Sequence, residues 1–313
     1  MNLLISIMKT KKIILALAIL VFACLFIGAA YSSQNSNADV DEILKNVEDK
    51  FDQKTFNDSK TGLEIPYNIY LPDNYDKSKN YPLVVFIADS SLVGKGEKAS
   101  LEQGLGGIIW ANDSKNNKEE CIVVVPTYSD VIIDDMNGNE KSEYLNATKN
   151  LIDNVSSSYS VDSNRIYGTG QSMGGMTLLY LASKYPDLFA AELFVSCQWD
   201  INELSNLDSQ KFFYIVSEGD EKASTGQKEV KEMLDSKKVK YGVLEGIDAQ
   251  ADNSNKVNSL INGNNNINFI SFKEGTVSSN STDNKMVGGE HMASFDYAYK
   301  LEPVRDWLFK QHK

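Results

Sequence analysis

The chain has 313 residues, of which 42% are hydrophobic, and a formal net charge of −12 at pH 7. This acidic balance argues against a nucleic-acid-binding protein, which would carry a basic surface. Its three cysteines and two histidines show none of the spacings of a metal site, so neither a metal nor another cofactor is expected.

Residues 1–30 have the pattern of an export signal. Lys9, Lys11 and Lys12 precede an apolar run from Ile13 to Ala30. A basic segment followed by an apolar one is typical of a signal peptide, and a run of this length also comes close to spanning a bilayer. We expect a signal peptide or an N-terminal membrane anchor, in a protein that is secreted or anchored outside the cell and touches the membrane through this segment alone.

Residues 31–53 are expected to form a polar linker and a short acidic helix, and residues 54–313 one catalytic α/β domain. Eight segments have the apolar pattern of strands: Leu63–Leu71, Pro82–Ala88, Cys121–Val125, Asn164–Thr169, Leu193–Cys197, Phe212–Ser217, Lys240–Leu244 and Ile267–Phe272. Four have the pattern of helices: Glu140–Ser157, Met173–Lys184, Gln227–Ser236 and Ser294–Phe309. This alternation predicts an α/β fold, a doubly wound, mostly parallel sheet with helices on both faces.

Two cysteines lie within the predicted strands. Cys121 begins one strand and Cys197 ends another. Because an unpaired cysteine behaves as a small hydrophobic residue, both are expected to be buried thiols rather than a disulfide.

One motif points to nucleophilic catalysis. Residues Gly170 to Gly174 read Gly-Gln-Ser-Met-Gly, between a predicted strand and a predicted helix. Strand, Ser-centred turn and helix is the setting of the G-x-S-x-G nucleophile elbow of α/β-hydrolases. Ser172 is therefore the expected nucleophile, and the N–H of Met173 is expected to face the developing oxyanion.

The base for this serine follows from the small number of histidines. The chain has only His291 and His312, and His312 is the penultimate residue, where chain ends tend to fray. His291 follows the last predicted strand and precedes the last predicted helix, the position of the catalytic histidine in this fold. We therefore expect His291 to accept the proton of Ser172.

The third catalytic residue should be an acid that follows a strand between the serine and the histidine in the chain. Asp220, after the strand Phe212–Ser217, is the first choice. Asp200 and Glu218 are the alternatives. Each of the three could instead be an ordinary turn or helix-capping carboxylate.

The second oxyanion donor should come from the loop after the strand Pro82–Ala88. This fold often has His-Gly-x-Gly there, whereas the chain has Ala88, Asp89, Ser90 and Ser91. The backbone N–H of Ser90 can still serve, because the donor belongs to the main chain. A carboxylate at Asp89 is unexpected beside a developing negative charge, unless it points away.

Two residues near the elbow are assigned to substrate binding, Trp199 and Gln171. Trp199 follows a strand at the edge of the sheet where pockets form. Gln198 and Trp110 are weaker candidates, and packing in the core is the alternative for the aromatic residues. Trp307 is expected in the core.

The chain resembles the α/β-hydrolases of the polyhydroxybutyrate-depolymerase, feruloyl-esterase and prolyl-oligopeptidase-like group over roughly Lys54 to Gln311. The segments that carry the resemblance are Ile65–Pro72, Tyr81–Phe86, Val161–Gly175, Tyr185–Ala191, His291–Met292 and Arg305–Leu308. By this resemblance, Ser172, Asp220 and His291 match the positions of the catalytic triad. The absent His-Gly pair is the main departure.

These observations predict an exported serine hydrolase that forms an acyl-enzyme on Ser172. The expected substrate is a carboxylic ester, as a small molecule or as an acyl group on a carbohydrate. Two alternatives stay open: a prolyl-oligopeptidase-like peptidase, and a catalytically weak surface or binding protein that kept the fold. The chain is too short for the large propeller domain that the peptidases usually carry, which favours the esterase.

Overall fold

A computed structural model describes residues 40–116, 118–135, 139–277 and 289–313. The chain divides into two compact units, Met1–Glu42 and Ile43–Lys313, and the second contains every described strand. The segment expected to direct export, residues 1–30, lies outside the described residues. Within the described ranges, no helix has both the length and the apolar character needed to cross a bilayer.

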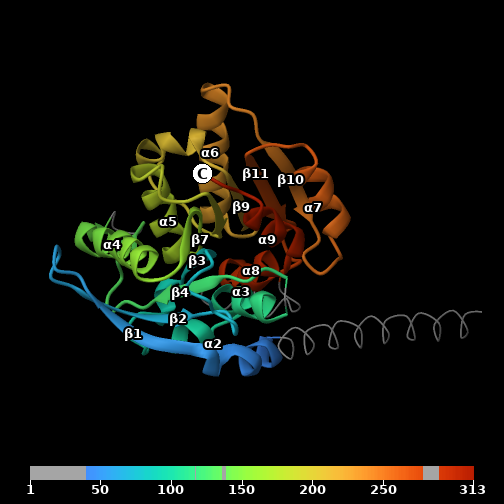
Figure 1. The fold of residues 1–313 in the computed structure, drawn as a ribbon. Helices are drawn as coiled ribbons and strands as arrows, with labels where there is room; N and C mark the ends of the chain where they lie inside the picture. Colours follow the sequence, from blue (N-terminus) through green and yellow to red (C-terminus); the bar gives the residue numbers. More distant parts are fainter. Residues whose placement is uncertain (1–39, 117, 136–138, 278–288) are drawn as a thin grey trace, which may run out of the picture. The chain divides into compact units, whose positions relative to one another are not determined.

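A mostly parallel sheet forms the centre of the unit Ile43–Lys313 (Figure 1). Within the described residues it has nine strands, in the order β1-β2-β4-β3-β7-β8-β9-β11-β10. Their bounds are β1 Phe51–Asn57, β2 Glu64–Tyr70, β3 Tyr81–Ile87, β4 Ile122–Pro126, β7 Val161–Gln171, β8 Ala191–Val195, β9 Phe212–Ser217, β10 Gly242–Ile247 and β11 Ile267–Phe272. Strand β2 runs antiparallel to both neighbours, and the strands from β4 to β10 are parallel to one another.

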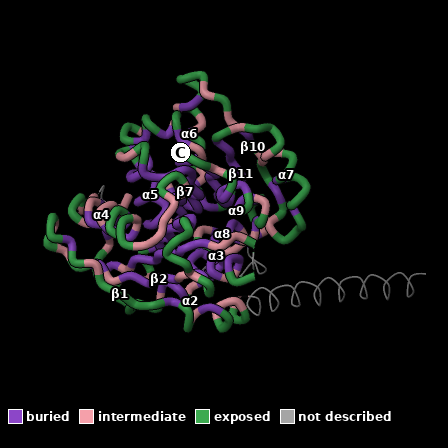
Figure 2. The backbone as a smooth tube through the Cα atoms, viewed as in Figure 1, coloured by how far each residue is buried: buried purple, intermediate pink, exposed green. Residues whose placement is uncertain are grey.

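The central strands are apolar on both faces because helices cover both faces. Every residue of β3, β4, β8, β9 and β11 is buried (Figure 2). On one face, Leu83 and Val85 of β3 belong to a core shared with three helices. On the other face, the ring of Phe86 lies 5.8 Å from that of Tyr299, and Phe213 lies 4.9 Å from Trp307. The predicted α/β fold with helices on both faces is confirmed.

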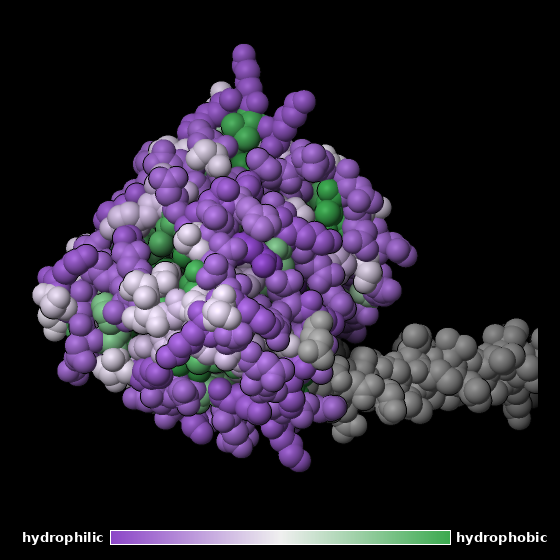
Figure 3. Space-filling view, viewed as in Figure 1, coloured by the Kyte–Doolittle hydropathy of each residue, from purple (hydrophilic) through white to green (hydrophobic). Residues whose placement is uncertain are grey.

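The helices pack in two layers. Three cover the face of Leu83: α4 (Ser142–Ser158), α5 (Met173–Lys184) and α6 (Glu221–Ser236). Three cover the face of Phe86: α3 (Leu105–Lys115), α8 (Gly289–Lys300) and α9 (Glu302–Phe309). Further helices are α2 (Ala99–Glu102) and α7 (Ser254–Ile261), and residues 40–47 are helical as well. The short strands β5 (Ile133–Asp134) and β6 (Asn139–Glu140) pair antiparallel. On the side drawn in Figure 3, hydrophilic residues cover most of the surface, and hydrophobic ones form small separate patches.

Several elements differ from the sequence-based expectation. Helix α6 begins at Glu221, because the carboxylate of Asp220 accepts a hydrogen bond from the Ala223 N–H at 3.3 Å. The single helix expected over Ser294–Phe309 is two helices, α8 and α9. The break falls at Leu301, because Pro303 has no N–H to donate to the carbonyl of Tyr299 and its ring would clash with that carbonyl in one continuous helix. Proline is well accommodated in the first turn of α9.

Other elements were not expected from the sequence at all, among them α2, α7, β5 and β6. Strand β1 begins at Phe51, inside the segment expected to be linker and helix, and most of its side chains are polar and exposed, so no apolar alternation marks it. Helix α3 was not expected either: nine of its eleven residues are buried, and such a helix lacks the polar face that reveals helical periodicity.

Both predicted buried thiols are confirmed. Cys121 and Cys197 are free and buried. Burial raises the pKa of each thiol, so both stay protonated at neutral pH. Cys197 also packs directly on the elbow, since a Cβ at Gly175 would lie 2.6 Å from its sulfur.

Candidate active site

Ser172 lies at a strained turn between β7 and α5. Its backbone has φ +51° and ψ −120°, which a non-glycine residue adopts only when its surroundings impose it. The flanking glycines explain how the turn fits: a Cβ at Gly174 would lie 1.9 Å from the carbonyl oxygen of Ile87, and one at Gly170 would lie 2.6 Å from the backbone of Gly174. Only glycine allows this close approach, and the turn exposes the serine hydroxyl at the end of the sheet.

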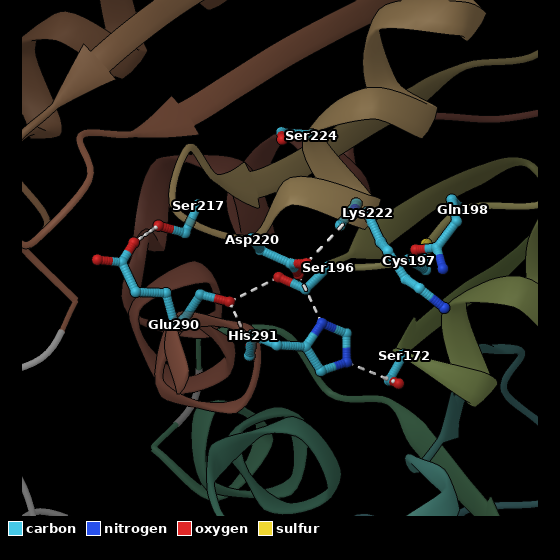
Figure 4. Close-up of polar contacts among 12 residues, drawn as sticks. Ser172, Ser196, Cys197, Gln198, Ser217, Asp220, Lys222, Ser224, Glu290 and His291 are labelled. Carbon is cyan, nitrogen blue, oxygen red and sulfur yellow. Dashed lines mark hydrogen bonds and ion pairs between the residues drawn. The ribbon is translucent and has the colours of Figure 1, made fainter. Parts of the chain in front are cut away.

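The structure brings the three expected catalytic residues into one hydrogen-bonded chain (Figure 4). Nε2 of His291 lies 2.8 Å from Oγ of Ser172. Nδ1 of the same imidazole lies 2.5 Å from Oδ2 of Asp220. Asp220 is buried, whereas Ser172 and His291 are half-buried, so the serine hydroxyl is the end of the chain that a substrate can reach.

The two alternative acids make other contacts. Asp200 caps a short 3-10 helix, η3 (Ile201–Glu203), and accepts the Asn202 N–H at 3.0 Å. Glu218 accepts the hydroxyl of Ser271 at 2.8 Å. Asp220 is therefore the acid that the fold presents to His291.

From the sequence, His291 was expected before the helix Ser294–Phe309. In the structure it lies within a helix, in the first turn of α8. The residue before it, Glu290, is buried, and its carboxylate accepts the hydroxyl of Ser217 and the N–H of Gly275, each at 2.5 Å. These bonds tie the first turn of α8 to the ends of β9 and β11. They hold the imidazole close to the loop that carries Asp220.

Two contacts of Ser294 hold the same turn on the other side of His291. The hydroxyl of Ser294 donates to the backbone oxygen of His291 at 2.8 Å and lies 2.6 Å from the hydroxyl of Ser196. Ser196, just after β8, is buried and has a positive φ of 43°. Glu290 and Ser294 thus anchor the backbone on both sides of the imidazole.

A cleft of about 390 Å³ opens beside the three residues. Its lining consists of Ser90, Val131, Ile133, Asp134, Asp135, Ser172, Met173, Met176, Gln198, Asp220, Lys222 and His291. The apolar part comes from Val131, Ile133 and the two methionines. In the polar part, Asp135 accepts hydrogen bonds from Gln198 at 2.7 Å and from Lys222 at 2.9 Å. The cleft therefore offers both apolar and polar groups to one substrate.

Ser90 and Met173 both line the cleft, together with the nucleophile. Met173 is the first residue of α5, and Ser90 is the first residue of the 3-10 helix η2 (Ser90–Leu92) that follows β3. The first amides of a helix have no acceptor within it. Both N–H groups are thus suited to bind an anionic oxygen in the cleft.

Hydrogen bonds occupy the carboxylate of Asp89, which reduces the conflict with a developing negative charge. It is buried, and its carboxylate accepts the Ser91 N–H at 2.7 Å. The side-chain amides of Gln103 and Gln171 also donate to it. Asp89 is not among the residues that line the cleft.

The structure does not place the two expected substrate-binding residues on the cleft. Consecutive residues of a strand point to opposite sides, so the side chain of Gln171 does not follow that of Ser172. Gln171 is buried, and its side-chain amide donates a hydrogen bond to Gln103 at 2.8 Å. Trp199 packs in the core, and its indole N–H donates to Glu203 at 2.8 Å. Trp110 is fully buried, and only Gln198 of the four candidates lines the cleft.

Sequence reasoning missed several residues of the cleft. Lys222 could have been found, since it follows Asp220 by two positions. Asp135, Val131 and Ile133 come from the segment between β4 and α4, which carries no motif. Their place in the site follows from the path of that segment over the end of the sheet.

The fold and the hydrogen-bonded serine, histidine and aspartate define an α/β-hydrolase. Residues 59–223, more than half of the chain, match the family described as "Putative esterase". The chain therefore belongs to this esterase family, which confirms the resemblance drawn from the sequence. None of the curated protein sequences compared with the chain matches it.

Solved structures show the same fold. A thermostable esterase has a TM-score of 0.62 at 23% identity, over 85% of this chain and 64% of the other. The feruloyl esterase module from Clostridium thermocellum, complexed with sinapinate, has a TM-score of 0.56 at 17% identity, over 83% and 88%. A "putative dipeptidyl aminopeptidase IV" from Bacteroides ovatus has 0.51 at 14%, over 83% and 36%. At these identities the likeness concerns the fold, which esterases and peptidases share.

Proposed function

We propose that the protein is an exported serine esterase that hydrolyses carboxylic esters through an acyl-enzyme on Ser172. The observation that carries the proposal is the hydrogen-bonded chain from Ser172 through His291 to Asp220, mounted on a strained elbow at the mouth of a cleft. Nucleophile, base and orienting acid in this order form the arrangement of acyl-transfer enzymes.

The geometry supports a two-step reaction. His291 Nε2 takes the proton of Ser172 as its oxygen attacks the ester carbonyl, and returns that proton to the leaving alcohol. Asp220 holds the Nδ1–H and stabilises the imidazolium while it exists. Water then attacks the acyl-enzyme by the same route, with His291 again as base. The N–H groups of Met173 and Ser90 stabilise the oxyanion in both steps.

Two further features concern the substrate and its location. The cleft is lined by both apolar and polar residues. Such a lining can accommodate an acyl group joined to a polar alcohol, such as a carbohydrate hydroxyl. The basic and apolar pattern of residues 1–30 supports export, with that segment cleaved or retained as an anchor.

A fluorophosphonate probe tests the proposal, because it reacts with activated serines. We expect mass spectrometry to locate the adduct on Ser172 in the purified protein. Ser172→Ala and His291→Ala should each lower ester hydrolysis by at least about a thousandfold. His312→Ala is the matched control, since it removes the only other histidine and should leave the rate unchanged.

Other outcomes would favour the rival functions. Comparable hydrolysis by the wild type and Ser172→Ala, or no labelling of a folded sample, would support a binding protein that kept the fold. Faster cleavage of a p-nitroanilide than of the matched p-nitrophenyl ester would support a peptidase.

A further inference from the structure

Asp89 is a buried carboxylate in an unusual place. It stands in the loop after β3, where the fold often has the first glycine of His-Gly-x-Gly, and only 4% of its surface is exposed. No ion pair of Asp89 occurs within the described ranges of the chain. Because burying an unpaired carboxylate is costly, its hydrogen bonds must supply the compensation.

Those bonds converge from three segments. Oδ1 of Asp89 accepts a hydrogen bond from the N–H of Ser91. Oδ2 accepts one from the side-chain amide of Gln103, which follows α2, and a second from that of Gln171 at 3.3 Å. The two glutamines are themselves joined at 2.8 Å, and Gln103 reaches the hydroxyl of Ser91 at 3.3 Å. Gln171 directly precedes the nucleophile, so the network joins the loop after β3 to the elbow.

The same bonds shape the loop without glycine. Asp89 has an ordinary extended backbone, with φ −76° and ψ 170°, and its side chain turns the chain into η2 by capping Ser91. Bonds from Leu92 N–H to Asp89 O at 3.4 Å and from Val93 N–H to Ser90 O at 3.3 Å close the turn. Ser90 lies inside this turn and lines the cleft, whereas Asp89 is not among the residues that line it.

We propose that Asp89 is a positioning residue that holds the Ser90 N–H in register with Ser172, in the role that loop glycines have in related enzymes. The inference rests on the proposed function, since it concerns the second oxyanion donor. Donors held in place before reaction stabilise the transition state without reorganisation. Losing the cap should therefore lower kcat more than it raises KM.

The test compares Asp89→Ala with Asp89→Asn. We expect Asp89→Ala to lower kcat for ester hydrolysis about 10- to 100-fold with KM changed less than about threefold. The same substitution should weaken the binding of a boronic acid inhibitor by a similar factor, because the adduct of this inhibitor on Ser172 carries a negative charge at the oxyanion position. Asp89→Asn keeps an acceptor for the Ser91 N–H but replaces the other carboxylate oxygen with a donor that faces the amides of Gln103 and Gln171. Because asparagine still caps the turn, kcat should recover in part and lie between the values of Asp89→Ala and the wild type.

Asp58→Ala is the matched control. Asp58 is equally buried, in the turn between β1 and β2, and accepts hydrogen bonds from the Lys60 N–H at 3.1 Å, Thr61 at 2.7 Å and Asn150 at 2.8 Å. Its loss should lower the unfolding temperature and leave kcat unchanged. If Asp89→Ala does not fold, Gln103→Ala removes one donor of the network and should lower kcat about three- to tenfold.

The outcomes separate the two proposals. A kcat for folded Asp89→Ala equal to that of the wild type, or a kcat for Asp89→Asn no higher than that of Asp89→Ala, would overturn this inference, while fluorophosphonate labelling of Ser172 keeps the esterase. A wild type that is folded but not labelled would overturn the esterase itself.

Discussion

At the scale of single residues, Glu192 in β8 stands apart from the site. It is fully buried, and within the described residues neither of its carboxylate oxygens has a hydrogen-bond partner. Burial raises the pKa of Glu192 from 4.5 to about 8, because the charged form loses its hydration. The carboxyl group is therefore protonated in the folded protein at neutral pH.

This residue predicts a pH-dependent loss of stability. Glu192 ionises near pH 4.5 in the unfolded chain and near pH 8 in the folded chain. The free energy of unfolding therefore decreases as the pH rises from about 4.5 to about 8, and it decreases no further above that range. Glu192→Gln cannot ionise and should be more stable than the wild type by on the order of 4 kcal/mol at pH 8. At pH 4 the two proteins should differ little. Urea unfolding at both pH values measures this.

Glu64→Gln provides the control, because Glu64 is an exposed strand glutamate in β2. It should change stability little at either pH. An advantage of Glu192→Gln that is equal at both pH values would contradict the explanation by ionisation and point to packing.

At the scale of elements, α8 determines how accurately the imidazole meets the serine. Its first turn is held by Glu290 on one side of His291 and by Ser294 on the other. A negative side chain in the first turn of a helix is also favourable, because the backbone N–H groups there are unpaired. Small displacements of a catalytic group cost large factors in rate.

Glu290→Gln is therefore expected to lower kcat about tenfold with little change in KM, because the amide replaces one of two acceptors with a donor. Steady-state kinetics on a soluble ester measures both constants. Glu302→Gln is the control: Glu302 is in the first turn of α9, and its ion pair with Lys118 is exposed. Equal kcat in both variants and the wild type would show that Glu290 only stabilises the fold.

At the scale of the whole molecule, charge should influence which esters reach the site. The chain carries a net charge of −12, and the cleft has three aspartates, Asp134, Asp135 and Asp220, beside one lysine, Lys222. A surface of one sign slows the approach of ligands of the same sign, and salt screens this effect.

We therefore expect an ester with an anionic alcohol group to have a lower kcat/KM than a neutral ester of the same size. Raising the salt concentration from about 20 to about 500 mM should increase kcat/KM for the anionic ester severalfold and leave the neutral ester nearly unchanged. The neutral ester is thus the control within one experiment. A decrease with salt for the anionic ester would instead indicate a cationic subsite.

The amino-acid sequence by itself determined the fold class, the nucleophile and the base. Continuous apolar strands such as Phe212–Ser217 can only lie inside a sheet covered on both faces. The elbow around Ser172 needs its glycines locally, and the scarcity of histidine left His291 as the base. These features depend on neighbours in the chain or on residue counts, so they are visible without coordinates.

Only the tertiary structure decided where side chains point. Asp220, Asp200 and Glu218 all follow strands, and contact with His291 alone separates them. Gln171 and Trp199 looked like cleft residues, yet each turns toward a partner behind the site. Asp89 turns toward Gln103 and Gln171, far away in the chain. Such orientations depend on which distant polar group satisfies a buried one, and only the assembled fold specifies that.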